Sequence, residues 1–320
     1  MPIFLCIHTI YKVVMYMIYN NICELIGNTP ILRLNKIEKK YSLENQIFAK
    51  IEKNNPGSSI KDRVAYQMII DAFNKGIINE KTTIIEATSG NTGIGLAIVC
   101  AYFNLKLVII MSEEVTKERI KMIETFGGKV ILTKKELGIE GAIKKARKIK
   151  EEIDNSYYIN QFDNYSNVLA HLKTTGNEIV EQFDKGLDYV FVGMGSGGTI
   201  MGISIKMKET NPDVKIIGIE PLGCPYYTRK EIGKYKIPGI GSTFVPNIFD
   251  LQYVDDIILV SDNEAKETML DIARIEGLGV GFSSGAVLAG AKKYIKENNI
   301  INKKILVIFP DTIERYLSML

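Results

Sequence analysis

The sequence predicts an α/β protein built from open, mostly parallel twisted sheets flanked by helices. Three observations lead to this fold class. Short apolar strands alternate with amphipathic helices, glycine-rich turns join strands to helices, and the chain is 46% hydrophobic and 24% charged, as globular proteins are. With 320 residues the chain is long enough for two domains with large buried cores.

A first α/β unit is expected in the first half of the chain, where strands and helices alternate as they do in a parallel sheet with crossover helices. A helix is expected to begin at Lys61, which follows the turn 55–59. The remaining predicted elements of this unit are strands over 83–87, 106–111 and 129–133 and helices over 92–103, 116–126 and 141–152.

A second unit of the same kind is expected after the polar connection that follows residue 159. The segment 222–250 is rich in Gly, Pro and Tyr and has no clear period, and segments of this type in compact enzymes are often binding or closing loops. The predicted elements are strands over 189–192, 214–219 and 304–309 and helices over 174–183, 199–209, 263–276 and 285–297.

Charge and composition argue against several classes of protein. The net charge of +3 arises from 40 basic and 37 acidic residues, so no nucleic-acid footprint is expected. The four cysteines lie far apart in the sequence, which favours a reducing cytosol over a disulfide framework. With His8 and His171 as the only histidines, we expect no metal site.

The N-terminal extension, residues 1–20, is strongly apolar but carries His8 and Lys12 near its middle. A membrane-spanning helix would place that lysine near the hydrocarbon centre at a cost of several kcal/mol, so no membrane anchor is expected. Met15 and Met17 are alternative starts, and an upstream mis-assigned start is the hypothesis that we favour.

Lys61 is the most informative single residue. It opens a predicted helix, where a cation faces the positive end of the helix dipole and its amine becomes easier to deprotonate. A neutral lysine amine is a nucleophile that forms Schiff bases with carbonyl compounds, including pyridoxal phosphate. Taken alone, such a residue is more often a solvated surface lysine.

Three turns rich in small residues each precede a predicted helix. The first, 88–93, and the third, 281–285, suit close approach of a ligand to helix N-terminal amides, although each is also explained by helix capping. The second, 193–199, has four glycines in six positions and suits a phosphate cradle.

The second turn also permits a different function. Gly193, Gly195 and Gly198 satisfy the dinucleotide pattern, and Glu220 follows after about 20 residues, where an acid that binds ribose would lie. An NAD-dependent dehydrogenase is therefore an alternative prediction. That alternative leaves Lys61 and the first turn without a role, whereas Gly197 and Thr199 could help to surround one phosphate monoester.

Together these motifs resemble the cysteine synthase family, which includes O-acetylserine sulfhydrylase and cystathionine β-synthase. The resemblance runs from about residue 22 to the C-terminus and rests on 28–30, 55–63, 88–93, 195–199 and 281–286, in that order. It implies the tryptophan synthase β-like fold, fold type II, with pyridoxal 5'-phosphate in a cleft between domains. The large domain would comprise 21–54 and 163–320, and a small mobile substrate-binding domain would comprise 55–162.

The resemblance also implies roles for individual residues. Lys61 would form the Schiff base and later remove the α-proton, Asn91 would bind the ring hydroxyl, and Ser283 would contact the pyridine nitrogen. A hydroxyl at that position leaves the nitrogen largely neutral, which favours loss of the β-substituent over transamination. The cofactor phosphate would be held by Gly195, Ser196, Gly197, Gly198 and Thr199. The substrate would be bound by Thr88, Ser89, Gly90, Thr92, Gln161, Gly241, Ser242 and Thr243.

Departures from the family pattern limit the choice of substrate. The segment after Gln161 lacks the usual proline, and Asn177 replaces another. At Ser242 and Thr243, O-acetylserine enzymes usually carry small residues, whereas enzymes like cystathionine β-synthase tend to have an aromatic residue and an acid. Hydroxyls at both positions could bind water or a polar leaving group.

The predicted activity is β-replacement on a serine- or cysteine-type amino acid through an aminoacrylate, most specifically cysteine synthesis from O-acetylserine and sulfide. The alternative within the family is a β-synthase of the lanthionine or cystathionine type that uses cysteine or serine and releases hydrogen sulfide. A regulatory homologue that binds the cofactor and a partner protein without turnover is a further alternative. We expect a cytoplasmic homodimer whose small-molecule partners are an amino acid and a thiol or sulfide.

Overall fold

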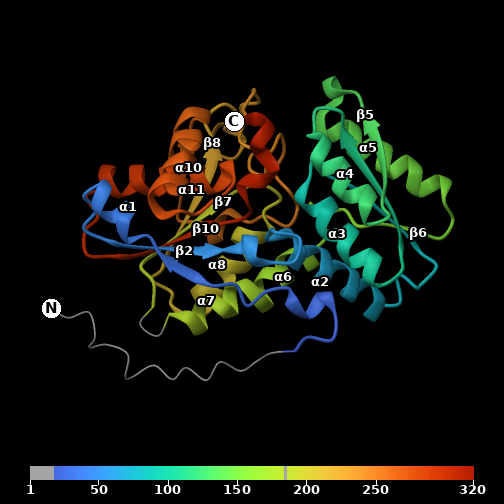
Figure 1. The fold of residues 1–320 in the computed structure, drawn as a ribbon, viewed down its shortest axis with the longest axis horizontal. Coiled ribbons are helices and arrows are strands. Elements are labelled where there is room, and N and C mark those ends of the chain that lie inside the picture. The colour runs from blue at the N-terminus through green and yellow to red at the C-terminus, as the bar shows by residue number, and fades with distance from the viewer. Residues whose placement is uncertain (1–17, 184–185) are drawn as a thin grey trace.

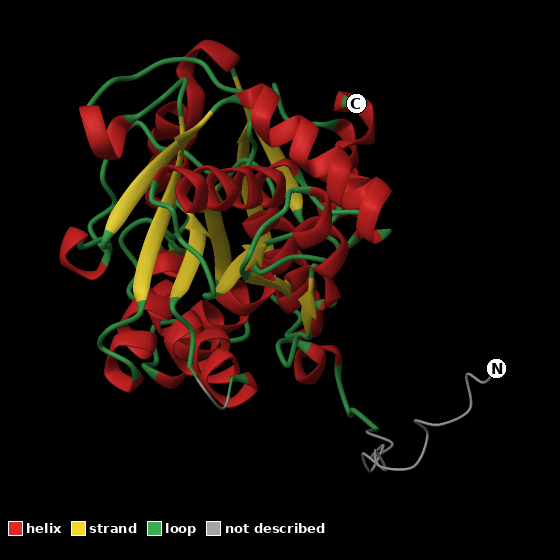
Figure 2. Cartoon of the chain, turned by 90° about the vertical axis from the view of Figure 1, so that its left-hand side faces the viewer, coloured by secondary structure: helices red, strands yellow, loops and turns green. Residues whose placement is uncertain are grey.

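The computed structural model describes residues 18–183 and 186–320, so most of the predicted N-terminal extension lies outside the described residues. Two β-sheets dominate the fold and occupy two lobes that lie side by side (Figure 1). Helices lie on both sides of the strands when the molecule is viewed from the side of the larger lobe (Figure 2). The predicted α/β class with two open, mostly parallel sheets is confirmed.

The larger sheet has six strands in the order β1-β2-β10-β7-β8-β9. Every neighbouring pair is parallel except β1 with β2. The bounds of the strands are β1 Ile31–Arg33, β2 Gln46–Ile51, β7 Tyr189–Gly193, β8 Lys215–Pro221, β9 Asp256–Val260 and β10 Lys304–Phe309.

The smaller sheet has four strands in the order β5-β4-β3-β6, and all of its pairs are parallel. All five residues of β3 are buried, as expected for a parallel strand that is covered on both faces. The strands are β3 Thr83–Ala87, β4 Lys106–Ser112, β5 Lys129–Thr133 and β6 Ser156–Tyr158.

Helices cover both faces of each sheet. The larger sheet packs against α1, α10 and α11 on one face and against α8 on the other, while α2 and α3 lie on the opposite face of the smaller sheet from α5. The helices are α1 Asn35–Lys40, α2 Lys61–Asn74, α3 Asn91–Tyr102, α4 Lys117–Thr125, α5 Gly138–Glu152, α6 Ser166–Ala170, α7 Asn177–Gln182, α8 Gly198–Thr210, α9 Tyr226–Arg229, α10 Asp262–Glu276 and α11 Phe282–Glu297.

Short helical turns complete the structure. One of them, η4, is a π-helix that separates α6 from α7 and replaces the first part of the single helix predicted over 174–183. The 3-10 turns are η1 Ile22–Leu25, η2 Glu52–Asn54, η3 Lys135–Leu137, η5 Leu251–Tyr253 and η6 Ile313–Met319, and the π-helix η4 is His171–Gly176.

The described strands of the smaller sheet fall within the predicted small domain, and those of the larger sheet fall outside it. This distribution is compatible with the predicted division at residues 55 and 162, and the domain boundaries themselves stay a prediction. Within residues 18–183 and 186–320, the structure has no helix that is both long and apolar enough to cross a bilayer.

Candidate active site

Lys61 is the first residue of α2, as predicted, and its side chain is half-buried. Burial lowers the pKa of its amine to about 8, and the nearby carboxylate of Asp311 only partly opposes this shift. Burial, rather than the helix dipole expected from the sequence, is the main cause of this easier deprotonation. The amine therefore has a substantial neutral fraction near physiological pH.

The turn before Lys61 is anchored to the end of β10. The backbone N–H of Ile60 donates to the carbonyl of Pro310 at 2.9 Å, and Ser59 forms an antiparallel bridge with Asp311. The side chain of the buried Asn55 accepts from the N–H of Gly27 at 2.8 Å. These contacts hold the lysine at the carboxyl end of a central parallel strand, where α/β proteins commonly bind ligands.

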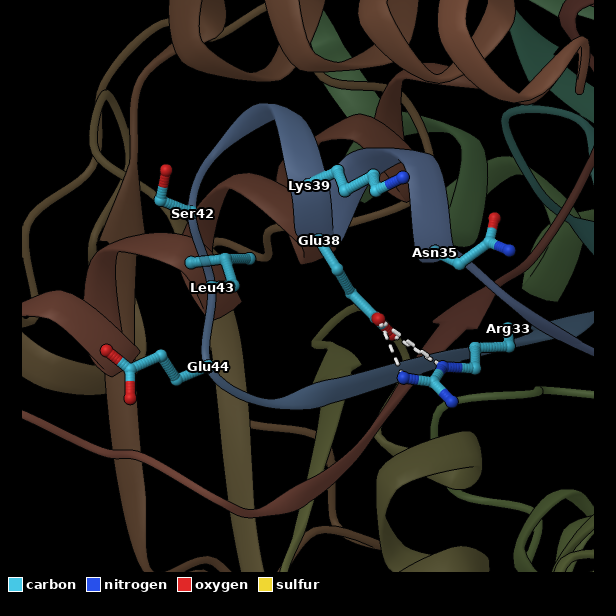
Figure 3. A pocket seen from close by; sticks show the side chains of 7 residues that line it. All are labelled: Arg33, Asn35, Glu38, Lys39, Ser42, Leu43 and Glu44. Carbon is cyan, nitrogen blue, oxygen red and sulfur yellow. Dashed lines mark hydrogen bonds and ion pairs between the residues drawn. The ribbon is translucent and has the colours of Figure 1, made fainter.

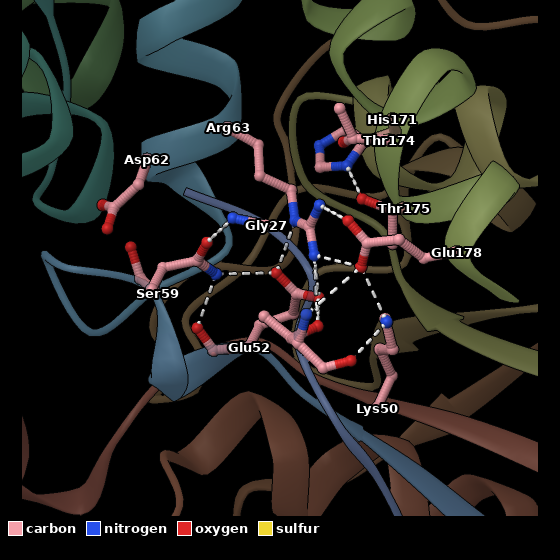
Figure 4. A network of polar contacts seen from close by, with 12 residues as sticks. Gly27, Lys50, Glu52, Ser59, Asp62, Arg63, His171, Thr174, Thr175 and Glu178 are labelled. Atoms are coloured by element: carbon pink, nitrogen blue, oxygen red, sulfur yellow. Dashed lines mark hydrogen bonds and ion pairs between the residues drawn. The ribbon is translucent and has the colours of Figure 1, made fainter. Parts of the chain in front are cut away.

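A buried ionic network surrounds Arg63 in the first turn of α2, the helix that Lys61 begins (Figure 4). Nε of Arg63 donates to Glu52 at 2.8 Å, and its two Nη atoms donate to Glu178 at 2.5 and 2.8 Å. Lys50 donates to the same Glu178 carboxylate at 2.7 Å. Burial opposes ionisation of Glu178, but Arg63 and Lys50 outweigh it and lower its pKa to about 2. The network ties the start of α2 to β2 and α7.

The glycine turn between β7 and α8 forms a cradle with little room for side chains. A Cβ on Gly198 would lie 2.0 Å from Oδ1 of Asn167, and one on Gly195 would lie 2.7 Å from the carbonyl oxygen of Gly239. Gly197 has a φ of 88°, a conformation that favours glycine. No side chain caps the start of α8, so its first amides are available to an anion.

Two polar side chains complete this glycine cradle, which comprises residues 193–199. Ser196 and Thr199 are buried, and Nδ2 of Asn167 donates to Oγ of Ser196 at 3.1 Å. Oδ1 of Asn167 is buried without a hydrogen-bond partner. The uncapped amides, the hydroxyls and the close glycine backbone fit the phosphate of pyridoxal phosphate.

The predicted alternative, a dehydrogenase, needs the carboxylate of Glu220 for a ribose. Glu220 is fully buried, and its carboxylate accepts from the N–H groups of Tyr227 at 2.5 Å and Thr228 at 3.2 Å and from the Thr228 hydroxyl at 2.9 Å. It therefore binds the start of the short helix α9. The geometry does not support a ribose site at this position.

The turn between β3 and α3 brings together part of the predicted carboxylate site. Thr88, Gly90, Thr92 and Gln161 are buried, while Ser89 is exposed. The hydroxyl of Thr92 donates to Oε1 of Gln161 at 2.8 Å, which joins two segments that lie far apart in the sequence. The start of α3 has no side-chain cap, so its amides are available to an anion.

Asn91 and Ser283 lie at the starts of two different helices. Asn91 is the first residue of α3, and its amide contacts Asp311 and Arg315 of the C-terminal segment. Ser283 is buried in the first turn of α11, which begins three residues earlier than the sequence indicated. The adjacent Ser284 has a buried hydroxyl without a hydrogen-bond partner.

The loop predicted to face the substrate is tied to the glycine cradle. The N–H of Gly241, which has a φ of 86°, donates to the carbonyl of Met194 at 2.7 Å. Both hydroxyls of interest already have partners: Ser242 donates to the carbonyl of Phe244 at 2.6 Å, and Thr243 donates to Glu140 of α5 at 3.1 Å. Their predicted role in substrate binding stays a prediction.

Sequence reasoning did not identify several side chains at this site. They are His171 in η4, which contacts Thr199, and Asp311, Arg315 and Tyr316 around η6. One pattern could have revealed Asp311, because it closely follows a buried parallel strand, at the edge of the sheet where ligands bind. The other residues had no such signature.

Other features lie away from this site. A shallow surface hollow on the α1 side of the molecule contains the ion pair between Arg33 and Glu38 (Figure 3). In the described part of the chain, no group of three or more His, Cys, Asp or Glu side chains could hold a metal ion. The residues around Lys61 therefore remain the best candidate for chemistry.

Known proteins match this chain over nearly all of its length. The family model described as "Pyridoxal-phosphate dependent enzyme" matches residues 22–311. Cysteine synthase B of Campylobacter jejuni is 44% identical over 301 residues, which cover 94% of this chain and 98% of the relative.

Two solved structures show the same similarity. A hydrogen sulfide-producing enzyme from Fusobacterium nucleatum has a TM-score of 0.91 and 39% identity, covering 94% of this chain and all of that one. An O-acetylserine dependent cystathionine beta-synthase from Helicobacter pylori has a TM-score of 0.89 and 38% identity, and the match covers 94% of this chain and 98% of that one.

Proposed function

The chain belongs to the family of pyridoxal-phosphate dependent enzymes, and on this premise we propose that it catalyses β-replacement on a serine- or cysteine-type amino acid. The reaction that we favour is the synthesis of cysteine from O-acetylserine and sulfide. Its support comes from the relatives, which include a cysteine synthase and an O-acetylserine dependent enzyme.

The observation that carries the proposal is the amine of Lys61 at the start of α2, with its pKa lowered to about 8. At pH 7 roughly one in ten of such amines is neutral. For an ordinary lysine the neutral fraction is below about one in a thousand. A neutral amine can hold the cofactor covalently and, once released, accept a proton. Lys61 is thus our candidate for both tasks.

The cofactor would be held at three further places. The amides of residues 195–198 and the hydroxyls of Ser196 and Thr199 would bind its phosphate, Asn91 would bind its ring oxygen, and Ser283 would hydrogen-bond its ring nitrogen. When bound, pyridoxal phosphate withdraws electrons from the substrate Cα and so makes the α-proton acidic. A neutral hydroxyl at Ser283 would keep this withdrawal moderate.

The substrate carboxylate would lie at the N-terminus of α3. There the uncapped amides, together with Thr88, Ser89, Gly90, Thr92 and Gln161, would supply the donors. Because Thr92 already donates to Gln161, the two side chains would act as one unit and orient the substrate Cα towards Lys61. The β-substituent would face Gly241, Ser242 and Thr243.

Movement of the small domain would complete the site. We assign residues 55–162 to this domain and 21–54 with 163–320 to the larger one. The hydrogen bond from Thr243 to Glu140 and the contact of the Phe162 and Phe244 rings, 5.1 Å between centroids, join the two parts at the substrate loop. Closure there would exclude water while Lys61 moves the proton.

A cysteine-using reaction that releases hydrogen sulfide is the second candidate. The similarity to a hydrogen sulfide-producing enzyme favours it, as do the two hydroxyl residues Ser242 and Thr243, which match neither usual pattern.

The test is to supply O-acetylserine, serine, cysteine and O-phosphoserine separately. Sulfide consumption or release and the amino-acid product are measured by mass spectrometry, while the visible spectrum reports whether each amino acid reaches the cofactor. Rapid cysteine formation from O-acetylserine and sulfide is the expected result. Sulfide release from cysteine as the faster reaction would support the second candidate, and no turnover with any donor would contradict both.

We further propose a homodimer in the cytoplasm. Cys23, Cys100 and Cys224 are buried free thiols, which fits a reducing compartment. Sedimentation of the purified protein measures the assembly state, and fractionation of the native cells measures its location.

A further inference from the structure

The C-terminal segment after β10 reaches the proposed cofactor site. Asp311 and Arg315 are buried, with 1% and 4% of their surfaces exposed, and both contact Asn91 at the start of α3. Nδ2 of Asn91 donates to Oδ2 of Asp311 at 2.7 Å, and a guanidinium nitrogen of Arg315 donates to Oδ1 of Asn91. Two groups of opposite charge therefore contact the two ends of one amide.

These contacts leave the amide of Asn91 one orientation. A carboxylate only accepts hydrogen bonds and a guanidinium only donates them, so the nitrogen must face Asp311 and the oxygen must face Arg315. The oxygen is then committed to Arg315 and one N–H is committed to Asp311. The remaining N–H is the group that Asn91 can offer to a ligand.

The surrounding contacts fix both charged residues. Arg315 also donates to the carbonyl of Gly57, in the turn that leads to Lys61. Tyr316 donates its hydroxyl to Asp311, and its ring packs edge-on against Phe282 at 5.5 Å. The segment thus contacts three elements of the proposed cofactor site: the Lys61 turn, α3 and α11.

We propose that Asp311 and Arg315 are positioning residues that clamp Asn91 as a hydrogen-bond donor towards the ring oxygen of the bound cofactor. This inference rests on the proposed function. A donor stabilises the deprotonated ring oxygen, because an anionic oxygen accepts a stronger hydrogen bond than a hydroxyl does. The clamp would therefore favour the form of the bound cofactor that absorbs visible light.

The clamp also explains the unusual burial of its members. Oδ1 of Asp311 is buried without a hydrogen-bond partner, beside Gly281, where a Cβ would lie 2.0 Å from it. An unpartnered buried carboxylate oxygen is costly in a site with only a structural role. The positive charge of Lys61 offsets part of that cost.

The experiment compares four variants of the full-length protein with the unmodified chain. Arg315→Met removes the donor, Arg315→Lys retains a charged donor, Asp311→Asn removes the negative charge, and Glu314→Gln is an exposed control in the same turn. Each protein is stripped of cofactor, titrated with pyridoxal phosphate, and examined by absorbance. Circular dichroism and thermal unfolding report whether each variant is folded.

We expect Arg315→Met to bind pyridoxal phosphate at least about tenfold more weakly, because Asn91 would no longer be held in place to donate its hydrogen bond to the anionic ring oxygen. Its bound cofactor should shift from the visible towards the near-ultraviolet band. Arg315→Lys should restore part of both properties, and Glu314→Gln should match the unmodified protein. If Arg315→Met does not fold, Asp311→Asn is expected to show the same spectral shift.

Unchanged affinity and an unchanged spectrum in folded Arg315→Met or Asp311→Asn would overturn the clamp while leaving the proposed function intact. Lower thermal stability with an unaltered spectrum would also overturn the clamp, because that result would indicate that Asp311 and Arg315 have only a structural role. An unmodified protein that binds no pyridoxal phosphate would instead contradict the proposed function itself.

Discussion

Nε2 of His171 lies 3.1 Å from Oγ1 of Thr199, so a buried imidazole in the π-helix η4 contacts the glycine cradle. Its other nitrogen lies 2.9 Å from the hydroxyl of Thr175. Burial, with Lys61 and Arg63 nearby, lowers the pKa of His171 well below its ordinary value, so the ring is neutral. A neutral ring has one donor and one acceptor.

This contact predicts that His171 orients the Thr199 hydroxyl. If that hydroxyl donates to the cofactor phosphate, Nε2 must donate to it and Nδ1 must accept from Thr175. His171→Leu should weaken binding of pyridoxal phosphate by about two- to tenfold, the value of one neutral hydrogen bond. Fluorescence titration of the cofactor-free protein measures this loss, and equal affinity in a folded variant would contradict it.

Arg63→Met should strongly destabilise the fold. It leaves the carboxylates of Glu52 and Glu178 buried and short of a partner, which typically costs about 3–5 kcal/mol. Lys148→Met is the control, because its ion pair with Glu152 is exposed on both sides, 67% and 54%, and is worth at most about 1 kcal/mol. Urea unfolding gives both values, and similar losses would disprove the importance of the buried network.

The same network predicts acid sensitivity. The pKa of Glu178 falls from 4.5 to about 2 on folding, because Arg63 and Lys50 outweigh the effect of burial. The stabilisation is thus complete above pH 4.5 and is lost as the pH falls towards 2. Urea unfolding across this range should show a smaller pH dependence in Arg63→Met than in the unmodified protein. An identical pH dependence would count against the assignment.

Lys61 should set the pH dependence of cofactor binding. Burial lowers its pKa to about 8, and only the unprotonated amine attacks the aldehyde of pyridoxal phosphate. The rate at which cofactor-free protein gains visible absorbance should rise about tenfold per pH unit below 8 and level off above it. A rate that keeps rising towards pH 10.5 would indicate an ordinary lysine.

Glu220 separates the family function from the dehydrogenase alternative. Because its carboxylate binds the start of α9, the protein should show no saturable binding of NADH in fluorescence titrations. Glu220→Gln should lower stability without creating or removing any NADH signal. Tight NADH binding that is lost in this variant would revive the alternative.

Much of the fold could be predicted because its apolar strands alternate with helices. The predicted strands 83–87 and 304–309 match β3 and β10 at both ends. Strand β2 was not predicted from the sequence, because lysine is usually a surface residue and Lys50 interrupts the apolar pattern. In the structure Lys50 is buried and pairs with Glu178. The helix predicted over 174–183 is instead η4 followed by α7. The segment η4 packs closely on α8 at Gly202, where a Cβ would lie 2.5 Å from the His171 side chain, and such a contact between segments is not visible in the sequence pattern.

The site was predictable where its residues form local motifs, as at Lys61 and in the glycine cradle. Asp311 and Arg315 were missed because their contacts join residues more than 200 positions apart. Pairings of this kind depend on how the strands are ordered in the sheet. No spacing in the sequence encodes them.

The most direct measurement of the central claim is to reduce the purified protein with borohydride, digest it and map the modified peptide by mass spectrometry. Reduction should abolish the visible absorbance and leave a phosphopyridoxyl group on Lys61, and Lys61→Ala should remain folded, lack that adduct and be nearly inactive. A cofactor fixed to a different lysine, or Lys61→Ala with the turnover of the unmodified protein, would contradict the account.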